Sequence, residues 1–402
     1  MAVTTTPATP SAEEARQLHQ REAVLLAWRK EFPILEHTTY LISNSLGAMP
    51  RAAEEGLQEY AESWRTRGIR AWEDAWWMLA AEVGDQIGAL LNAAPGSVSC
   101  HQNVTQCQAT VASCLDFTGK RNKVVYSDLN FPSVMYLWEA QRHYGARIHM
   151  VETDGIHVPL DRMLDAIDEH TAIVPISHVI FRSSYLQDAK AIVEKAHRVG
   201  ALVLLDCFQA TGCVPVDVKD LGVDFATGGV LKWLCGGPGT AYLYVRPDLA
   251  PTLHPRFTGW IASQDPFAFQ VGEIQRTNTQ YRFMNGTPNI PALYAARPGL
   301  SIIQAAAVEN IRLKSKRQVA KIIAMARERG WRVNTPEDPE RRGGTVSLDL
   351  PNGKEICAAL IDREILVDYR PQAGIRMAPH FYTTDDEIDR AIAALDELVP
   401  SR

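Results

Sequence analysis

Two charged residues, Asp206 and Lys232, stand in surroundings that are unusual for surface charges. Asp206 ends the apolar run Ala201–Leu205, which has the composition of a strand buried on both faces. Lys232 follows the small residues Ala226–Gly229 and precedes the glycine-rich loop Gly236–Gly239. A carboxylate at the end of a parallel strand points into the crevice where ligands bind. An amine in such a place can attack an aldehyde, and a carboxylate can keep a heterocyclic nitrogen protonated.

Pyridoxal phosphate is an aldehyde cofactor that needs both groups. A lysine amine holds it as a Schiff base, and an anion beside the ring nitrogen lets the ring accept electrons. Lys232 can be this amine and Asp206 this anion. Taken singly, each residue also fits a plainer interpretation, an aspartate that caps a turn and a lysine at a loop rim. Their order along the chain with Gln209, Gly212 and Asp224 favours the catalytic interpretation.

The same stretch resembles a known superfamily of enzymes. The motif residues are D-x-x-Q-x-x-G-x-x-P-x-D from Asp206 to Asp217, then Asp224, Gly228, Lys232-Trp233-Leu234 and Gly236–Gly239. This pattern is similar to the class V aminotransferase superfamily of fold type I pyridoxal phosphate enzymes, which includes kynureninases, cysteine desulfurases and isopenicillin N epimerases. The likeness extends from about Tyr40 to Leu398. It implies an α/β fold with a mostly parallel seven-stranded sheet in a large domain and a smaller C-terminal α/β domain.

Length and the order of elements support this organisation. The chain of 402 residues with 46% hydrophobic side chains is long enough for two cores. We predict an N-terminal arm and helix over residues 1–45, a large cofactor-binding domain over 46–295 and a small domain over 296–402. Strands alternate with helices before Asp206, which indicates a mostly parallel sheet covered on both sides. The helices expected in this region include Arg51–Arg67, Ala80–Leu91 and Gln106–Leu115, and those expected near the C-terminus are a helical region Pro291–Arg329, Glu355–Ile361 and Asp385–Leu398.

The segment His101–Thr105 is a candidate phosphate site. It bridges a predicted strand, Val98–Cys100, to a predicted helix that begins at Gln106. Small polar residues at a helix N-terminus offer N–H groups and hydroxyls to an anion. We therefore expect Val104 and Thr105 to bind the cofactor phosphate, although ordinary N-capping by Asn103 or Thr105 fits the same residues.

The resemblance implies roles for further residues. Phe131 falls where family members place the ring that stacks on the cofactor, and Gln209 falls where they place a contact to its ring. Trp260 and Thr287 match residues that approach the phosphate. The residue that aligns with Thr287 often comes from the neighbouring subunit, which implies a homodimer with shared active sites. Arg376 matches the arginine that holds the substrate α-carboxylate through a two-bond fork.

The segment Asn44–Gly47, followed by Pro50, looks like the N-terminal signature of kynureninases. On this basis Asn44 and Ser45 are predicted to bind substrate. A turn that precedes a helix is an equally simple interpretation of the same residues.

Three positions depart from the kynureninase pattern. Leu231 stands before the lysine where a tyrosine is usual, Gln209 replaces a histidine, and Val134 replaces the aspartate of Phe-Pro-x-Asp. A phenol beside the lysine would bind phosphate and move protons during carbon–carbon cleavage. Its absence predicts that kynurenine itself is a poor substrate.

These observations predict a pyridoxal phosphate enzyme that acts on an L-α-amino acid, a kynureninase-like hydrolase or lyase that breaks a bond at Cβ or Cγ. A class V aminotransferase, an epimerase and a C–S lyase without a catalytic cysteine are the alternatives, and a pseudo-enzyme that keeps the fold is a further one. Intact Lys232 and Asp206 argue against a pseudo-enzyme. A persulfide-forming desulfurase is disfavoured because Leu366–Met377 contains no cysteine and Cys357 falls in a predicted helix.

Composition limits the partners. The chain has 41 basic and 47 acidic side chains and no basic cluster, so nothing indicates binding to nucleic acid or to an anionic membrane. It has no run of about 18 apolar residues, and Met1–Ala15 lacks an apolar leader, so we expect a cytoplasmic protein. The seven cysteines include no C-x-x-C pair, which favours free buried thiols over disulfides or a metal site.

Overall fold

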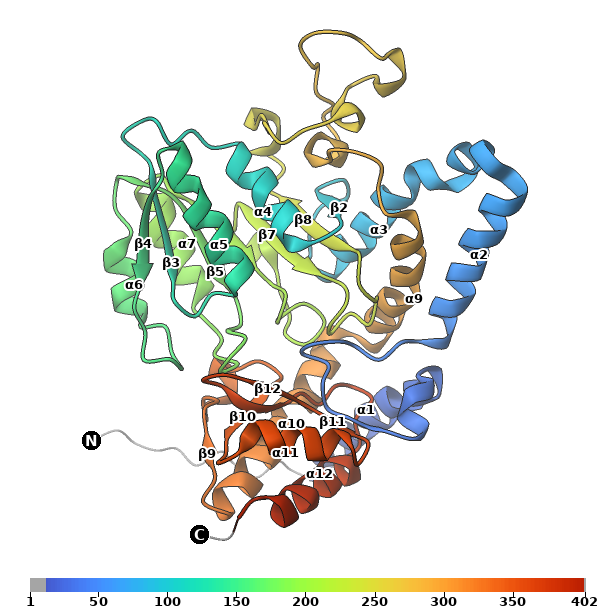
Figure 1. Cartoon of the computed structure of the whole chain (residues 1–402), viewed down its shortest axis with the longest axis vertical. Coiled ribbons are helices and arrows are strands. Elements are labelled where there is room, and N and C mark those ends of the chain that lie inside the picture. The colour runs from blue at the N-terminus through green and yellow to red at the C-terminus, as the bar shows by residue number, and fades with distance from the viewer. Residues whose placement is uncertain (1–11, 401–402) are drawn as a thin grey trace.

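A seven-stranded sheet forms the centre of the computed structural model, which describes residues 12–400 (Figure 1). Its strand order is β2-β8-β7-β6-β5-β3-β4. Only β8 runs antiparallel to its neighbours, β7 and β2. The mostly parallel seven-stranded sheet predicted from the sequence is therefore confirmed. The strands are β2 (Val98–His101), β3 (Lys123–Ser127), β4 (Arg147–Val151), β5 (Thr171–Ser177), β6 (Leu202–Asp206), β7 (Phe225–Gly229) and β8 (Ala241–Val245).

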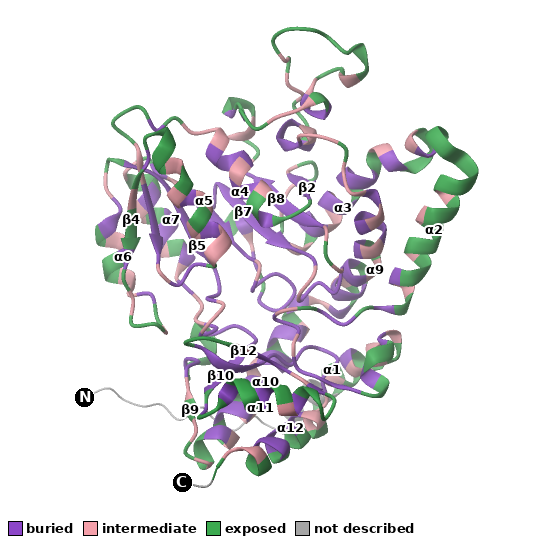
Figure 2. Cartoon of the chain, viewed as in Figure 1, coloured by how far each residue is buried: buried purple, intermediate pink, exposed green. Residues whose placement is uncertain are grey.

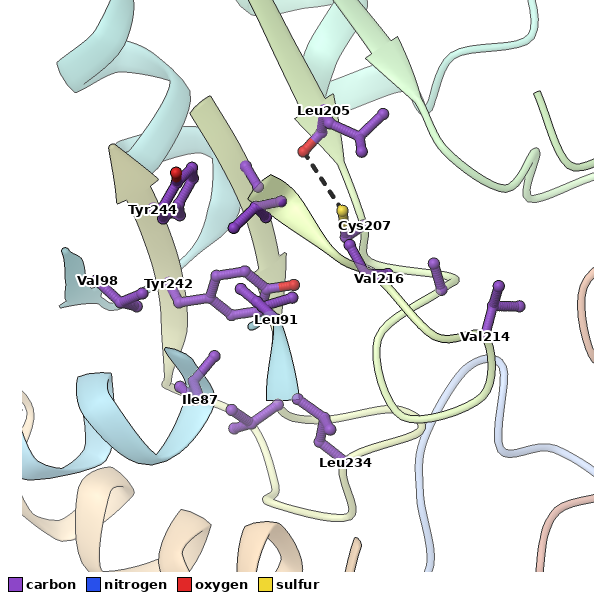
Figure 3. Packing of buried hydrophobic residues seen from close by; sticks show 14 of the residues in the cluster. Ile87, Leu91, Val98, Leu205, Cys207, Val214, Val216, Leu234, Tyr242 and Tyr244 are labelled. Atoms are coloured by element: carbon purple, nitrogen blue, oxygen red, sulfur yellow. Dashed lines mark hydrogen bonds between the residues drawn. The ribbon is translucent and has the colours of Figure 1, made fainter. Parts of the chain in front are cut away.

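Helices cover both faces of this sheet, so its central strands lie in the interior (Figure 2). Alternate residues of a strand enter two different cores, as the two-residue period of a strand requires. Leu204 and Leu243 belong to the core beneath α4 and α5. Leu205 and Tyr242 belong to the core that α3, α7 and α9 cover, and Figure 3 shows both side chains among their neighbours. The helices of this part of the chain are α2 (Arg51–Arg67), α3 (Trp77–Leu90), α4 (Val104–Ser113), α5 (Pro132–Ala140), α6 (Leu160–Ala166), α7 (Ala189–Arg198), α8 (Val218–Leu221) and α9 (Ile290–Ala306).

The C-terminal part has its own sheet and its own hydrophobic core. Four antiparallel strands lie in the order β12-β13-β10-β9. The helices of this part are α10 (Val308–Glu328), α11 (Gly353–Ile361) and α12 (Asp385–Leu398), and the strands are β9 (Arg332–Val333), β10 (Val346–Asp349), β11 (Ile365–Leu366), β12 (Asp368–Arg370) and β13 (Gly374–Met377). Helices α10, α11 and α12 share this core with strands β10 and β13, and together they form the second, smaller α/β unit that the sequence predicted.

The helical region predicted from Pro291 to Arg329 consists of two helices. They meet at Ala307, whose φ of 59° lies in the left-handed region and ends α9. α9 packs against α2 and α3, whereas α10 contacts α12 and β10. The predicted division between residues 295 and 296 falls inside α9, and it stays a prediction.

The N-terminal segment joins the two parts of the molecule. Helix α1 (Ala12–Leu26) contacts α10, and strand β1 (Thr39–Tyr40) pairs in parallel with β11. A few residues later, the N–H of Gly47 donates to the carbonyl of Leu231 at 2.8 Å, beside the predicted catalytic lysine. Residues 1–11 of the predicted arm lie outside the described residues.

Two further observations bear on the expectations from composition. Across residues 12–400, no helix has the length and apolar composition that a membrane crossing requires. All seven cysteines lie among these residues, and each is a free thiol; all but Cys114 are buried.

Candidate active site

A cavity of about 270 Å³ lies at the carboxyl ends of β5 and β6, against the start of α4. The carboxyl edge of a parallel sheet is where open α/β folds bind ligands. Six of the predicted site residues line this one cavity, namely Val104, Thr105, Phe131, Asp206, Gln209 and Lys232; the other lining residues are Asn103, Ser133, Ser177, Val179, Phe181, Phe208 and Leu231. The cavity thus combines an amine, a carboxylate and a largely apolar wall.

Asp206 is the last residue of β6 and is 5% exposed. Its Oδ1 accepts a hydrogen bond from the backbone N–H of Phe208 at 2.9 Å. Burial raises the pKa of this carboxyl to about 6, because desolvation outweighs the hydrogen bond from Phe208 and the charge of Lys232. A cationic partner inside the cavity would restore the carboxylate, which is what a protonated ring nitrogen supplies.

The amine of Lys232 lies near the aromatic rings of Phe208 and Phe131. Its Nζ lies 4.4 Å from the ring centroid of Phe208 and 5.7 Å from that of Phe131. Burial and the positive charge of Arg376 lower the pKa of Lys232 to about 8, while Asp206 opposes the shift. A lysine with a lowered pKa has its lone pair free for a larger fraction of the time near neutral pH, as a nucleophile requires.

The start of α4 is open to an anion. The side chain of Asn103 caps the helix by accepting the N–H of Gln106 at 3.0 Å. The helix begins at Val104, two residues before the predicted start, so Val104 and Thr105 occupy its first turn, where backbone N–H groups have no partner within the helix. Both interpretations of the sequence are therefore compatible, because Asn103 supplies the cap and the next two residues face the cavity.

Gln209 links the N-terminal segment to the lysine loop. Its Nε2 donates to the carbonyl of Asn44 at 2.9 Å, and its Oε1 accepts from the indole N–H of Trp233 at 3.1 Å. The amide is thus held in one orientation at the cavity wall. The side chain of Asn44 is fully buried, and neither of its amide atoms has a partner among the described residues.

Arg376 does not line the cavity but lies directly behind its wall. Its Nη1 donates to the carbonyl of Phe181 at 2.7 Å, and its Nη2 donates to Ser45 Oγ at 3.1 Å. Its Nε donates to Asp368 Oδ1 at 2.7 Å. Burial alone would raise the pKa of Asp368, but the hydrogen bond and charge of Arg376 hold it below its usual value.

The structure of one chain does not bring Trp260 and Thr287 to this cavity. Thr287 lines a second cavity of about 280 Å³, whose wall also includes Gln106 of α4 and Gln102, which precedes that helix. Trp260 is 41% exposed and belongs to an aromatic cluster in which its ring lies 6.0 Å from that of Trp77. The roles implied for these two residues stay predictions.

Sequence reasoning missed part of the cavity wall and the partner of Arg376. Val179 and Phe181 follow the end of β5, the strand beside β6, so the rule that placed Asp206 at the cavity could have placed them there too. Phe208 stands two residues after Asp206. Asp368 is opposite Arg376 in the pairing of β12 with β13, and no local sequence pattern indicates that register.

The arrangement fits pyridoxal phosphate. Lys232 and Asp206 supply the amine and the anion, the first turn of α4 supplies donors for a phosphate, and Phe131 supplies an aromatic face in the same cavity.

A family model described as class-V aminotransferase matches residues 39–390. An uncharacterised aminotransferase of Bacillus subtilis, YcbU, is 32% identical over 366 residues, which cover 91% of this chain and 95% of that protein. The kynureninase of Pseudomonas fluorescens is 30% identical over 387 residues, covering 92% of this chain and 91% of its own length. The kynureninase of Geobacillus thermodenitrificans is 28% identical, covering 98% and 95%.

Solved structures confirm the predicted fold. The apo cysteine desulfurase of Thermococcus onnurineus NA1 superposes with a TM-score of 0.83 at 21% identity, covering 93% of this chain and 97% of that one. At this identity the likeness concerns the fold alone. Since the family model spans most of the chain, the chain belongs to the class-V aminotransferase family, whose enzymes use pyridoxal phosphate.

Proposed function

We propose that this enzyme acts on an L-α-amino acid in the manner of a kynureninase, breaking a bond at Cβ or Cγ. The observation that carries the proposal is the presence of Lys232, Asp206 and the first turn of α4 in one cavity. Pyridoxal phosphate, when bound, supplies an electron sink for the carbanion that forms at the substrate Cα. The protein's contribution is to position the substrate, to hold protons and to move them.

Lys232 is the group that removes and returns the Cα proton. Its pKa of about 8 suits this role, because the amine can both accept and release a proton near neutral pH. Asp206 keeps the ring nitrogen of the cofactor protonated. Its burial strengthens this interaction, since a charge pair is stronger where water is excluded.

Arg376 holds the substrate α-carboxylate from the cavity wall near Phe181. Four of its five N–H groups are engaged by Asp368, Phe181 and Ser45. A two-bond grip on a substrate therefore requires Arg376 to exchange a partner. The hydrogen bond from Arg376 to Ser45 is the one that can break. The Ser45 hydroxyl also donates to Asp368, and it keeps that bond when Arg376 turns away.

The apolar side chain of Leu231 in the cavity wall favours a substrate other than kynurenine. Leu231 lines the cavity directly before the lysine, and its side chain can neither transfer a proton nor form a hydrogen bond. The kynureninases at about 30% identity support the scaffold, whereas the cavity residues determine the chemistry. The likeness to YcbU, whose name describes an aminotransferase, makes amino-group exchange the second candidate.

A panel of L-amino acids, monitored by the cofactor spectrum and by released alanine, pyruvate, ammonia or sulfide, tests the proposal. We expect a cleavage product from an amino acid other than kynurenine, and a gain of kynurenine cleavage in Leu231→Tyr. Efficient release of anthranilate and alanine by the unmodified enzyme would establish a plain kynureninase instead. Amino-group exchange with a keto acid as the sole reaction would establish an aminotransferase. We further propose a homodimer in the cytoplasm.

A further inference from the structure

Phe208 contacts both of the residues on which the site depends. Its backbone N–H donates to Asp206 Oδ1 at 2.9 Å, and its ring centroid lies 4.4 Å from Lys232 Nζ. It also lines the cavity itself. One residue thus joins the carboxylate to the amine, although its place in the sequence indicates no such role.

The ring is the nearest defined partner of the Lys232 amine. Within residues 12–400, no hydrogen bond or ion pair joins Nζ to another side chain or to a carbonyl. The second ring, that of Phe131, is farther away, at 5.7 Å. A cation that lies within about 6 Å of a ring centroid is attracted by the negative face of the ring.

The backbone of β7 makes room for this ring. A Cβ atom at Gly229 would lie 2.4 Å from Cζ of Phe208 and 2.8 Å from its Cε2. Since such contacts are far below van der Waals distance, Phe208 can occupy its place only because residue 229 has no side chain. The glycine at the end of β7 and the phenylalanine after β6 therefore form a matched pair.

We propose that Phe208 is a positioning residue, which holds the Lys232 amine against its ring face and fixes the Asp206 carboxylate through its backbone N–H. The ring favours the protonated amine and so opposes the effect of burial. It acts within a field of four charges, in which Asp206 and Asp368 favour the ammonium while Arg376 and Arg370 disfavour it. Among these influences, the ring is the one that can be changed without altering a charge.

The proposal predicts how the reactivity of Lys232 depends on pH. Only the neutral amine reacts with formaldehyde and a mild borane, so the extent of methylation reports the protonation of each lysine. The protein is freed of cofactor and methylated briefly across a pH series, and the peptide that contains residue 232 is quantified by mass spectrometry. Lys190, an exposed lysine on α7, is the internal reference in every sample.

Two changes at position 208 separate the ring's electronic effect from its bulk. Phe208→Leu keeps an apolar side chain and removes the ring, and 3,5-difluorophenylalanine in its place keeps the shape but weakens the negative face. We expect the pH midpoint of Lys232 methylation to fall by about 0.5 to 1.5 in the leucine variant and by less in the fluorinated protein. Gly229→Ala, which displaces the ring, should lower the midpoint as well.

Lys190 should keep its midpoint in all of these proteins, and far-ultraviolet circular dichroism should confirm that they fold. A midpoint for Lys232 that is the same in the wild type, in Phe208→Leu and in the fluorinated protein would overturn the proposal. The fluorinated protein carries the test alone if the leucine variant does not fold. The inference uses the proposed role of Lys232, but because methylation needs neither cofactor nor substrate, its failure would leave that role intact.

Discussion

Arg376 and Asp368 face each other across neighbouring antiparallel strands, with Arg376 Nε donating to Asp368 Oδ1 at 2.7 Å. Both side chains are nearly buried, at 3% and 8% exposure. A buried pair of this kind is costly to break on one side, because the remaining charge loses its counterion in a place that water does not reach.

Replacing Asp368 should therefore destabilise the protein. Asp368→Asn is expected to lower the free energy of unfolding by about 3 kcal/mol, as measured by urea denaturation. Asp349→Asn is the matched control, because Asp349 forms an exposed pair with Arg332 at 3.5 Å. That change should cost less than about 1 kcal/mol. Equal losses of unfolding free energy in the two variants would show that the buried pair contributes no more to stability than the exposed pair.

Lys232 should carry the cofactor. Lys232→Ala is expected to purify as a folded protein that lacks a visible absorbance band sensitive to borohydride, because no other amine lines the cavity. Lys190→Ala, which removes a lysine paired with Asp220 on the surface, should keep the band. Recovery of the borohydride-reduced adduct on a peptide without residue 232 would contradict the assignment.

The Asp206 carboxylate should have two opposite effects. Its ionisation should lower the stability of the cofactor-free protein, and its charge should support activity. In the cofactor-free protein its pKa is about 6 against a usual value of 3.8, so the folded state holds the proton more tightly. The free energy of unfolding therefore falls as pH rises from about 4 to 6, by about 3 kcal/mol from this group. Asp206→Asn lacks this titration, so its stability relative to the wild type should rise over that interval and then level off.

The same Asp206→Asn variant should lose most of its turnover, because an amide cannot stabilise a protonated ring nitrogen by charge. Parallel urea titrations at several pH values, together with steady-state kinetics of the reconstituted enzyme, measure the two effects. A stability difference that does not change between pH 4 and 6 would mean that Asp206 ionises normally in the folded state.

Thr287 should act across a dimer interface. Mixing Lys232→Ala chains with Thr287→Val chains, each impaired alone, should restore about a quarter of the wild-type sites if a site takes the two residues from different chains. The control is a mixture of Lys232→Ala with Asp206→Asn, whose residues line one cavity in one chain. This second mixture should stay inactive. Sedimentation of the active enzyme as a monomer would refute the shared site.

Much of the local structure could be predicted from the sequence. The bounds of α2 (Arg51–Arg67) and α12 (Asp385–Leu398) are confirmed to the residue. Both helices have an amphipathic pattern, Pro50 directly precedes α2, and Thr384 begins a capping box at α12. The apolar strand that ends at Asp206 and the small residues before Lys232 likewise indicated where the cavity lies, because both patterns arise from local burial.

What the sequence did not reveal depends on contacts between distant residues. The segment 364–369 alternates like one strand, but it forms two, because β11 pairs with β1 while β12 pairs with β13. Similarly, the alignment of Arg376 with a substrate ligand gave no hint that Asp368 already occupies its guanidinium. Such pairings are chosen by partners elsewhere in the chain, which a local pattern does not encode.

The pairing of the N-terminal segment with the C-terminal unit determines when the site can form during synthesis. Leu41 accepts a hydrogen bond from the N–H of Ala378 at 2.7 Å, and Thr38 contacts Glu364, 326 residues away. A ribosome makes the chain from its N-terminus, so the segment that carries Asn44 and Ser45 waits without its partner strands until nearly the whole chain has emerged. The large sheet can collapse earlier, but the contact between Ser45 and Arg376 forms only after residue 376 has been made.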